Sequence, residues 1–297
     1  MGGNYVTGIF KIPRRKRKGI NVQKGEEVWI NAQLDQPEFV RMTVEELYKA
    51  GAGKVRVNWS DDKVTKLHYK NQSVATLGKV PSYELARYKY MAKKLPSMLH
   101  IISEDPDALK GVNQKKITKA RMKSYPKIKP YRDEMDGKYK WCIGAVPNVE
   151  WAKKVFPGET EEVAVEKLWE AILSTSRVDD NDACENWDRH NEDLVLRRKA
   201  LQDLKLVELE YKSSNGTDFR VGLIPGMLWC GGAEEAKDKG MYNPNIPSEE
   251  CFTTPMSGKA EGVLVASKPL SYQGELIEDF SIYFENGRAV RVEARKG

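Results

Sequence analysis

Between residues 27 and 146 the sequence alternates short strand-like runs with segments that repeat apolar residues at helical spacing. Glu27–Asn31 predicts a buried strand, and Val40, Val44 and Leu47 repeat at helical spacing before Gly51 ends that helix. We expect strands at 27–31, 54–59, 97–102 and 140–146, and helices at 37–50, 82–94 and 114–124. Because alternating strands and helices form parallel sheets covered on both faces, this part predicts an α/β fold with a doubly wound, mainly parallel sheet.

The pattern changes near residue 204. Two helical stretches, at about 160–174 and 182–204, are followed by strands and turns. Asn286-Gly287 joins two strand-like runs and is the strongest short signal for a β-hairpin. The sequence therefore predicts an N-terminal α/β domain over 19–204 and a strand-rich (α+β) second domain over 205–297. Strands are expected at 205–211, 218–223, 262–266 and 280–294.

Residues 1–18 form an atypical basic leader. The net charge is +6, but six of the 49 Lys and Arg residues lie within 11–18, and the remaining 43 equal the 43 Asp and Glu residues. Composition outside the leader therefore indicates no basic groove, and we expect no nucleic-acid partner. A nucleic-acid-binding protein that uses residues 11–18 is a disfavoured alternative.

Composition also bears on location. No uninterrupted apolar run approaches the roughly 20 residues of a membrane helix, and the basic leader lacks the apolar segment of a signal peptide. Cys142, Cys184, Cys230 and Cys251 lie far apart and form no Cys-x-x-Cys pair. Such spacing favours reduced thiols. We expect a cytoplasmic protein with no membrane partner.

Common catalytic motifs are absent from the sequence: it has no phosphate-binding loop, no His-Glu-x-x-His and no Gly-x-Ser-x-Gly. Of the three histidines, His100 lies in an apolar run and is expected in the core. His68 and His190 lie on polar stretches and are expected to face solvent. A catalytic triad or a multi-histidine metal centre within this chain is therefore not expected.

One acidic doublet stands in an unusual setting. The segment Asn243–Pro255 contains three prolines, which hold it extended, and Glu249 and Glu250 lie in its middle. Adjacent side chains of an extended chain point to opposite faces, so one glutamate could face inward as a ligand for a hard metal ion. Two solvated glutamates on a surface loop are the competing interpretation, and it is favoured on these grounds alone because carboxylates are mostly exposed.

The segment Asn245–Glu250, followed by Phe252–Pro255, resembles the signature loop of the thermophilic metalloaminopeptidase family, of the aminopeptidase T and aminopeptidase S type. The resemblance spans about residues 19–297. Further matching segments in the same order are Asn21–Asn31, Val57–Asp61, Trp151–Pro157, Leu168–Ile172, Arg177–Asp179, Gly216–Asp218, Lys268–Leu270 and Phe284–Arg288.

The resemblance implies a two-domain enzyme, usually a homodimer, that releases N-terminal amino acids from peptides. It implies two divalent metal ions per complete active site (zinc, cobalt or magnesium) that activate a water molecule. The first metal ligand of the family is a glutamate of the signature loop, a role that falls on Glu250 or Glu249, with Glu250 preferred. No catalytic or substrate-binding residue is assigned.

Two departures from the family pattern matter. The chain ends before the further glutamate, histidine and aspartate ligands of the family, so we expect a C-terminally truncated member in which 205–297 is the first part of the catalytic domain. We expect little or no turnover by this chain alone.

Residues 1–18 do not resemble the family and suggest a shifted reading frame, which resequencing would test. The alternative function is an inactive remnant or a dimerisation module.

Overall fold

A computed structural model describes residues 19–178, 182–272 and 275–297, so the basic leader lies outside the described residues. The chain divides into two compact units. The first comprises Met1–Asn191 and Ala233–Ser248, and the second comprises Glu192–Gly232 and Glu249–Gly297. Each unit is described by itself.

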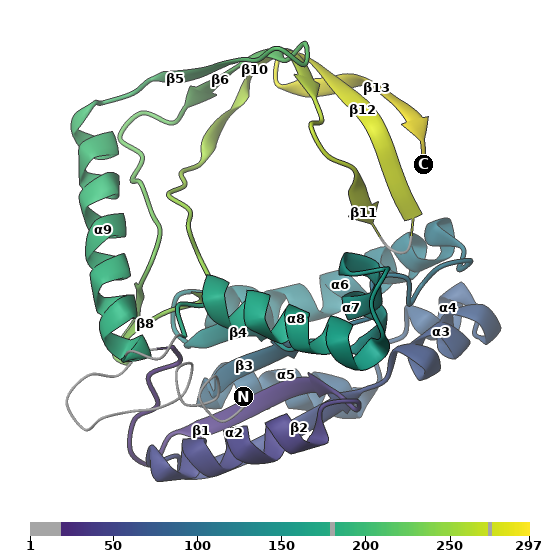
Figure 1. Ribbon diagram of the computed structural model, residues 1–297, viewed down its shortest axis with the longest axis vertical. Coiled ribbons are helices and arrows are strands. Elements are labelled where there is room, and N and C mark those ends of the chain that lie inside the picture. Colours follow the sequence, from purple (N-terminus) through teal and green to yellow (C-terminus); the bar gives the residue numbers. More distant parts are fainter. Residues whose placement is uncertain (1–18, 179–181, 273–274) are drawn as a thin grey trace. The chain divides into compact units, whose positions relative to one another are not determined.

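A five-stranded parallel sheet forms the centre of the first unit (Figure 1). Its strand order is β2-β1-β3-β4-β9, and all four pairs are parallel. The expected parallel sheet is confirmed, with a fifth strand that the sequence pattern did not predict. The strands are β1 (Glu27–Gln33), β2 (Lys54–Ser60), β3 (Ser97–Ile102), β4 (Trp141–Ala145) and β9 (Asn245–Ile246).

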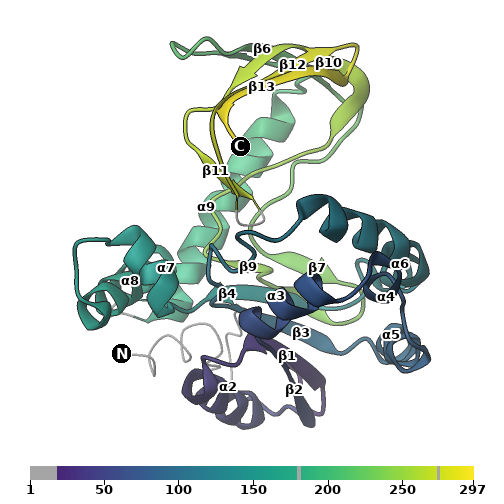
Figure 2. The same cartoon turned by 90° about the vertical axis from the view of Figure 1, so that its right-hand side faces the viewer.

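Helices cover both faces of this sheet, as a doubly wound fold requires. One face, which includes Val28, Ile30 and Leu99, packs against α2 (Pro37–Lys49), α7 (Val149–Val155) and α8 (Glu161–Thr175). The opposite face, which includes Trp29 and Met98, packs against α5 (Ser82–Lys94) and α6 (Gln114–Met135). Figure 2 shows α5 and α6 on one side of the sheet and α7 and α8 on the other.

Two short helices, α3 (Asp62–Asn71) and α4 (Val74–Leu77), were not predicted from the pattern. Neither has a buried residue. Their starts are marked by capping side chains instead: Asp61 accepts a hydrogen bond from the Val64 amide, and Ser73 accepts one from the Thr76 amide.

Helix α6 is longer than expected, because it continues through Pro126 and Pro130 to Met135. The expected end at residue 124 was wrong. Both prolines are exposed and lie four residues apart, on the same side of the helix. The carbonyl groups that lose their intrahelical partners therefore face water, which can satisfy them.

An antiparallel sheet with path order β11-β12-β10-β6-β5 dominates the second unit, and β13 pairs with β12. Asn286 and Gly287 both have positive φ, at 49° and 76°, and join β12 to β13, so the predicted hairpin is confirmed. The strands are β5 (Glu208–Lys212), β6 (Asp218–Leu223), β10 (Pro255–Val265), β11 (Leu270–Tyr272), β12 (Glu275–Glu285) and β13 (Arg288–Lys296).

Burial differs between the two units. Both hydrophobic core clusters consist of residues of the first unit. Among the described residues of the second unit, the buried hydrophobic side chains are Leu194, Phe219 and Leu223. No helix among the described residues is long and apolar enough to span a membrane.

Candidate metal-ligand loop

The acidic loop Asn243–Pro255 begins as part of the parallel sheet. Asn245 and Ile246 form β9, whose register partners on β4 are Ile143 and Gly144. The Ile143 amide donates a hydrogen bond to the Pro244 carbonyl at 2.8 Å, and Ile246 is only 2% exposed. The first half of the loop is thus anchored at the edge of a rigid sheet.

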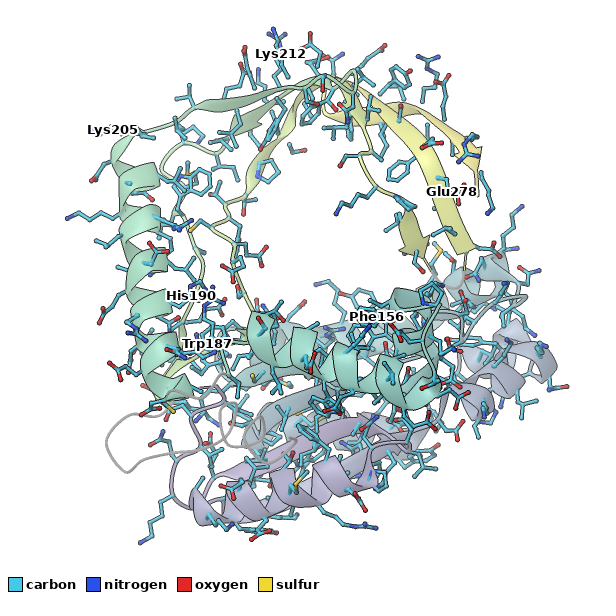
Figure 3. The ribbon with its side chains drawn as sticks, viewed as in Figure 1. Phe156, Trp187, His190, Lys205, Lys212 and Glu278 are labelled. Atoms are coloured by element: carbon cyan, nitrogen blue, oxygen red, sulfur yellow. The ribbon has the colours of Figure 1, made fainter. Side chains whose placement is uncertain are left out.

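Helix α9 (Ala183–Asp203) holds the loop at the next residues. His190 Nε2 lies 2.6 Å from the Ser248 carbonyl oxygen, and Asn191 exchanges side-chain hydrogen bonds with Asn243. The His190 ring meets the buried Trp187 ring edge-on at 5.4 Å between centroids (Figure 3). His190 is only 8% exposed, so the expectation that it faces solvent was wrong.

The second half of the loop belongs to the second unit, because the division falls between Ser248 and Glu249. Phe252 and Cys230 form an antiparallel bridge with hydrogen bonds in both directions, at 2.9 and 2.8 Å. Gly231 has φ +146°, and a Cβ added there would overlap the Glu250 carbonyl oxygen. The backbone at Glu250 is therefore fixed by a close approach that only glycine allows.

Three further hydrogen bonds hold the second half of the loop and the segment beside it. Thr253 donates its hydroxyl to the Leu228 carbonyl at 2.9 Å. Gln202 of α9 donates to the Met227 carbonyl and accepts from the Trp229 amide, each at 3.1 Å. The segment that lies against the loop is thereby tied to the end of α9.

Both glutamates of the doublet have exposed side chains. Glu249 takes part in an interaction with its surroundings. For the Glu250 carboxylate, the described part of the chain gives no hydrogen bond or ion pair. Exposure of both side chains is what two solvated glutamates on a surface loop would show, and it leaves the Glu250 carboxylate accessible.

The described residues do not by themselves complete a metal centre. Within 19–178, 182–272 and 275–297, no group of three or more His, Cys, Asp or Glu side chains is arranged to hold a metal ion. Divalent ions need several oxygen or nitrogen donors each. The loop could therefore supply one ligand, but its donors alone are too few to hold two metal ions.

Of the other residues considered from the sequence, His68 is exposed, as expected. His100 is half-buried on β3 and hydrogen-bonds Asn31. Among the described residues, Cys142, Cys184, Cys230 and Cys251 form no disulfide bond, and complete burial raises the pKa of Cys142 to about 12.

Sequence reasoning missed His190 and Gly231, which position the loop. No local pattern distinguishes His190, because its partner lies 58 residues away. The adjacent glycines Gly231 and Gly232 are a usable signal, since a glycine doublet indicates positive φ or close backbone approach.

Comparisons with known proteins agree with this architecture. Residues 10–297 match the family model described as thermophilic metalloprotease (M29). The chain is 35% identical over 280 residues to aminopeptidase AmpS of Bacillus subtilis, covering 94% of this chain and 68% of that protein. It is 35% identical over 285 residues to aminopeptidase T of Thermus thermophilus, and the match covers 95% of this chain and 69% of that protein.

A solved structure is also similar. Wild-type AmpT from Thermus thermophilus matches with a TM-score of 0.86 and 33% identity, over 100% of this chain and 72% of that one. The family match and the similar relatives cover nearly the whole chain, including both the parallel and the antiparallel sheet. The chain therefore belongs to the thermophilic metalloprotease family (M29), a family of metal-dependent hydrolases.

Proposed function

We propose that this protein acts as an aminopeptidase that releases N-terminal amino acids from peptides. The names of its relatives support this assignment, since AmpS and aminopeptidase T are called aminopeptidases. The observation that carries it is the accessible Glu250 carboxylate, at a residue whose backbone is held by the close approach of Gly231. A rigid backbone with an available carboxylate suits a ligand position.

We further propose that Glu250, rather than Glu249, is the ligand from this loop. The backbone of Glu250 is fixed by Gly231, whereas Glu249 already interacts with its surroundings. Two divalent ions per complete site, zinc, cobalt or magnesium, would polarise the substrate carbonyl and lower the pKa of a bound water.

The donor set of residues 1–297 is proposed to be incomplete. The loop carboxylates are the candidate ligands among the described residues, which contain no group of three donors. We therefore expect little or no turnover by residues 1–297 alone. In this proposal, 19–204 is the N-terminal α/β domain and 205–297 is the first part of the catalytic domain.

The decisive experiment joins residues 1–297 to the remaining C-terminal portion of Bacillus subtilis AmpS. Hydrolysis of aminoacyl-p-nitroanilides is measured for this chimera and for residues 1–297 alone. We expect chelator-sensitive release by the chimera, restored by cobalt or zinc, and little by residues 1–297. In the chimera, Glu250→Gln should lower kcat/KM by about 100-fold or more. Glu249→Gln should stay within about threefold of the parent.

Each part of the proposal has its own contrary result. Release that survives chelation would refute metal dependence, and equal loss in both glutamine variants would refute the choice of Glu250. Robust release by residues 1–297 alone would refute incompleteness. A folded chimera without any release would favour an inactive or dimerisation module instead.

We also propose a cytoplasmic homodimer that acts on peptides. The lack of a disulfide bond among the described cysteines supports a reducing compartment. Sedimentation equilibrium of the purified protein tests the dimer: a single species with the mass of one chain across the concentration range would contradict it.

A further inference from the structure

The first unit contains a cavity of about 490 Å³ between the sheet and helices α5 and α6. Its floor consists of side chains from three neighbouring strands, and its walls come from the two helices. The volume falls within the range of roughly 300–1,000 Å³ that is usual for small-molecule sites. The acidic doublet is not among its lining residues.

Polar side chains occupy the floor of the cavity, where a parallel sheet is usually apolar. Asn31 on β1 is the register partner of Asn58 on β2 and of His100 on β3. Asn58 Nδ2 donates to Asn31 Oδ1 at 3.1 Å, and Asn31 Nδ2 lies 3.4 Å from His100 Nδ1. Arg56 Nε donates to Asn58 Oδ1 at 3.1 Å.

These hydrogen bonds run in one direction, from Arg56 through the two asparagines to His100. Because an amide nitrogen of Asn31 is the donor, His100 Nδ1 accepts, and the ring proton lies on Nε2. Burial lowers the pKa of His100, which favours this neutral form. A chain of hydrogen bonds that starts at a cation polarises its last donor, so the Nε2–H of His100 is a strong donor at the cavity floor.

Arg87 provides a second hydrogen-bond donor for a ligand in the cavity. Arg87 lines the cavity, and its buried Nε has no hydrogen-bond partner among the described residues, although its terminal nitrogen pairs with Glu84. Unsatisfied buried donors are rare and indicate a missing acceptor. The acceptor that matches two N–H donors is a carboxylate.

The remaining lining explains the rest of the ligand. Tyr88, Met91 and Trp29 supply apolar and aromatic surface, Asp133 and Asp136 supply negative charge, and Arg132 adds a positive charge to that of Arg87. Asp133 already pairs with Lys129, which leaves Asp136 as the carboxylate available to a cation. A ligand with a carboxylate, an ammonium group and an apolar body would pair with the two N–H donors, with Asp136 and with the apolar surface, respectively.

We propose that this cavity binds a free α-amino acid with an aromatic or long aliphatic side chain. Its carboxylate accepts from His100 and Arg87, its ammonium group lies toward Asp136, and its side chain packs against Tyr88 and Met91. The site is independent of the peptidase activity, because it needs no metal ion and does not involve Glu250.

Equilibrium dialysis of the metal-free protein with radiolabelled L-phenylalanine tests the proposal. We expect saturable binding below about 10 mM, and about tenfold weaker binding for His100→Phe and for Arg87→Gln, since each removes a hydrogen bond to a charged group. His68→Phe, at an exposed histidine, and Glu250→Gln should bind as the parent does. 3-Phenylpropionate and L-phenylalaninamide, which lack the ammonium group and the carboxylate, should each bind more weakly.

Three results would overturn the proposal. The first is no saturable binding by the parent protein. The second is unchanged binding in Arg87→Gln. Circular dichroism checks that this variant is folded, so the test still holds if His100→Phe does not fold. The third is equal binding of L-phenylalanine and its two analogues. Loss of binding in Glu250→Gln would instead assign the ligand to the metal-ligand loop and also refute this site.

Discussion

At the scale of single residues, the acidic loop depends on one glycine. Gly231 combines a φ of +146° with a backbone approach to Glu250 that leaves no space for a side chain. The neighbouring Cys230 and Phe252 pair through two backbone hydrogen bonds, so the chain cannot move away from the contact without breaking them. A change at position 231 should therefore be transmitted directly to the proposed ligand.

We predict that Gly231→Ala lowers the free energy of unfolding by about 1–3 kcal/mol and reduces metal-dependent activity of the chimera. Urea titration and the p-nitroanilide assay measure the two effects. Gly226→Ala is the matched control, because Gly226 also has positive φ, at 75°, but a Cβ there meets nothing within 4 Å. The control should cost about 1 kcal/mol and leave activity intact. Equal effects of the two changes would show that the loss comes from the positive φ and not from the contact between Gly231 and Glu250.

His100 is a second residue whose surroundings have a measurable consequence. Burial lowers its pKa below the ordinary value of 6.5. The unfolded chain therefore binds a proton at a higher pH than the folded chain does, and stability is lost as the pH falls through this interval. Arg87, Arg132, Asp133 and Asp136 line the same cavity as His100.

We predict that the free energy of unfolding, measured without added amino acid, falls more steeply in the parent than in His100→Asn as the pH is lowered below 6.5. The difference between the two proteins isolates His100 from other titrating groups. Urea titrations at several pH values provide the measurement. Parallel pH profiles for the two proteins would contradict the prediction.

At the scale of elements, α9 and β9 together determine where the loop begins. β9 has only two residues, and it is held by pairing with β4 on one side and by side chains of α9 at Asn243 and Ser248. A strand this short has little stability of its own, so the side chains of α9 contribute much of its positioning. His190 acts here as a positioning residue.

We predict that His190→Phe preserves the ring packing on Trp187 but leaves the Ser248 carbonyl without its hydrogen bond. The expected loss is about 1–2 kcal/mol of stability, with a lower metal affinity of the chimera measured by titration of the metal-free enzyme. His190→Gln, which can still donate to Ser248, should recover part of the affinity. If both variants bind metal as the parent does, His190 has only a structural role.

At the scale of the whole molecule, the two units bury very different amounts of apolar surface. The parallel sheet packs on both faces, with Val28, Ile30 and Leu99 at most 1% exposed. Along β13, by contrast, all nine residues are exposed, and Val290 and Val292 are 52% and 62% exposed. Since burial of apolar surface provides most of the stabilising free energy, the described part of the second unit should open more readily than the first.

We predict that amide hydrogens of β12 and β13 exchange at least about tenfold faster than those of β1 and β3 in residues 1–297. Hydrogen–deuterium exchange with mass spectrometry measures this difference. Fusion to the AmpS portion should slow exchange in β12 and β13 if that portion covers the sheet. Equal protection of the two sheets in residues 1–297 would contradict the prediction.

Much of the fold follows from local sequence. The alternation of strand and helix patterns over 27–146 predicted four parallel strands and helices on both faces, and Asn286-Gly287 predicted a hairpin. These features are local, because periodicity and positive φ depend on residues close together in the chain. The same logic failed at Pro126 and Pro130, since only the structure reveals that both prolines face solvent.

The sequence alone determined the architecture of the central sheet and singled out Glu249 and Glu250 as candidate ligands. Only the tertiary structure decided that β9 joins that sheet, that His190 contacts Ser248, and that Gly231 lies against Glu250. Each of these contacts joins segments far apart in the chain. No local pattern of side chains specifies such a contact, because it exists only after the intervening elements have packed.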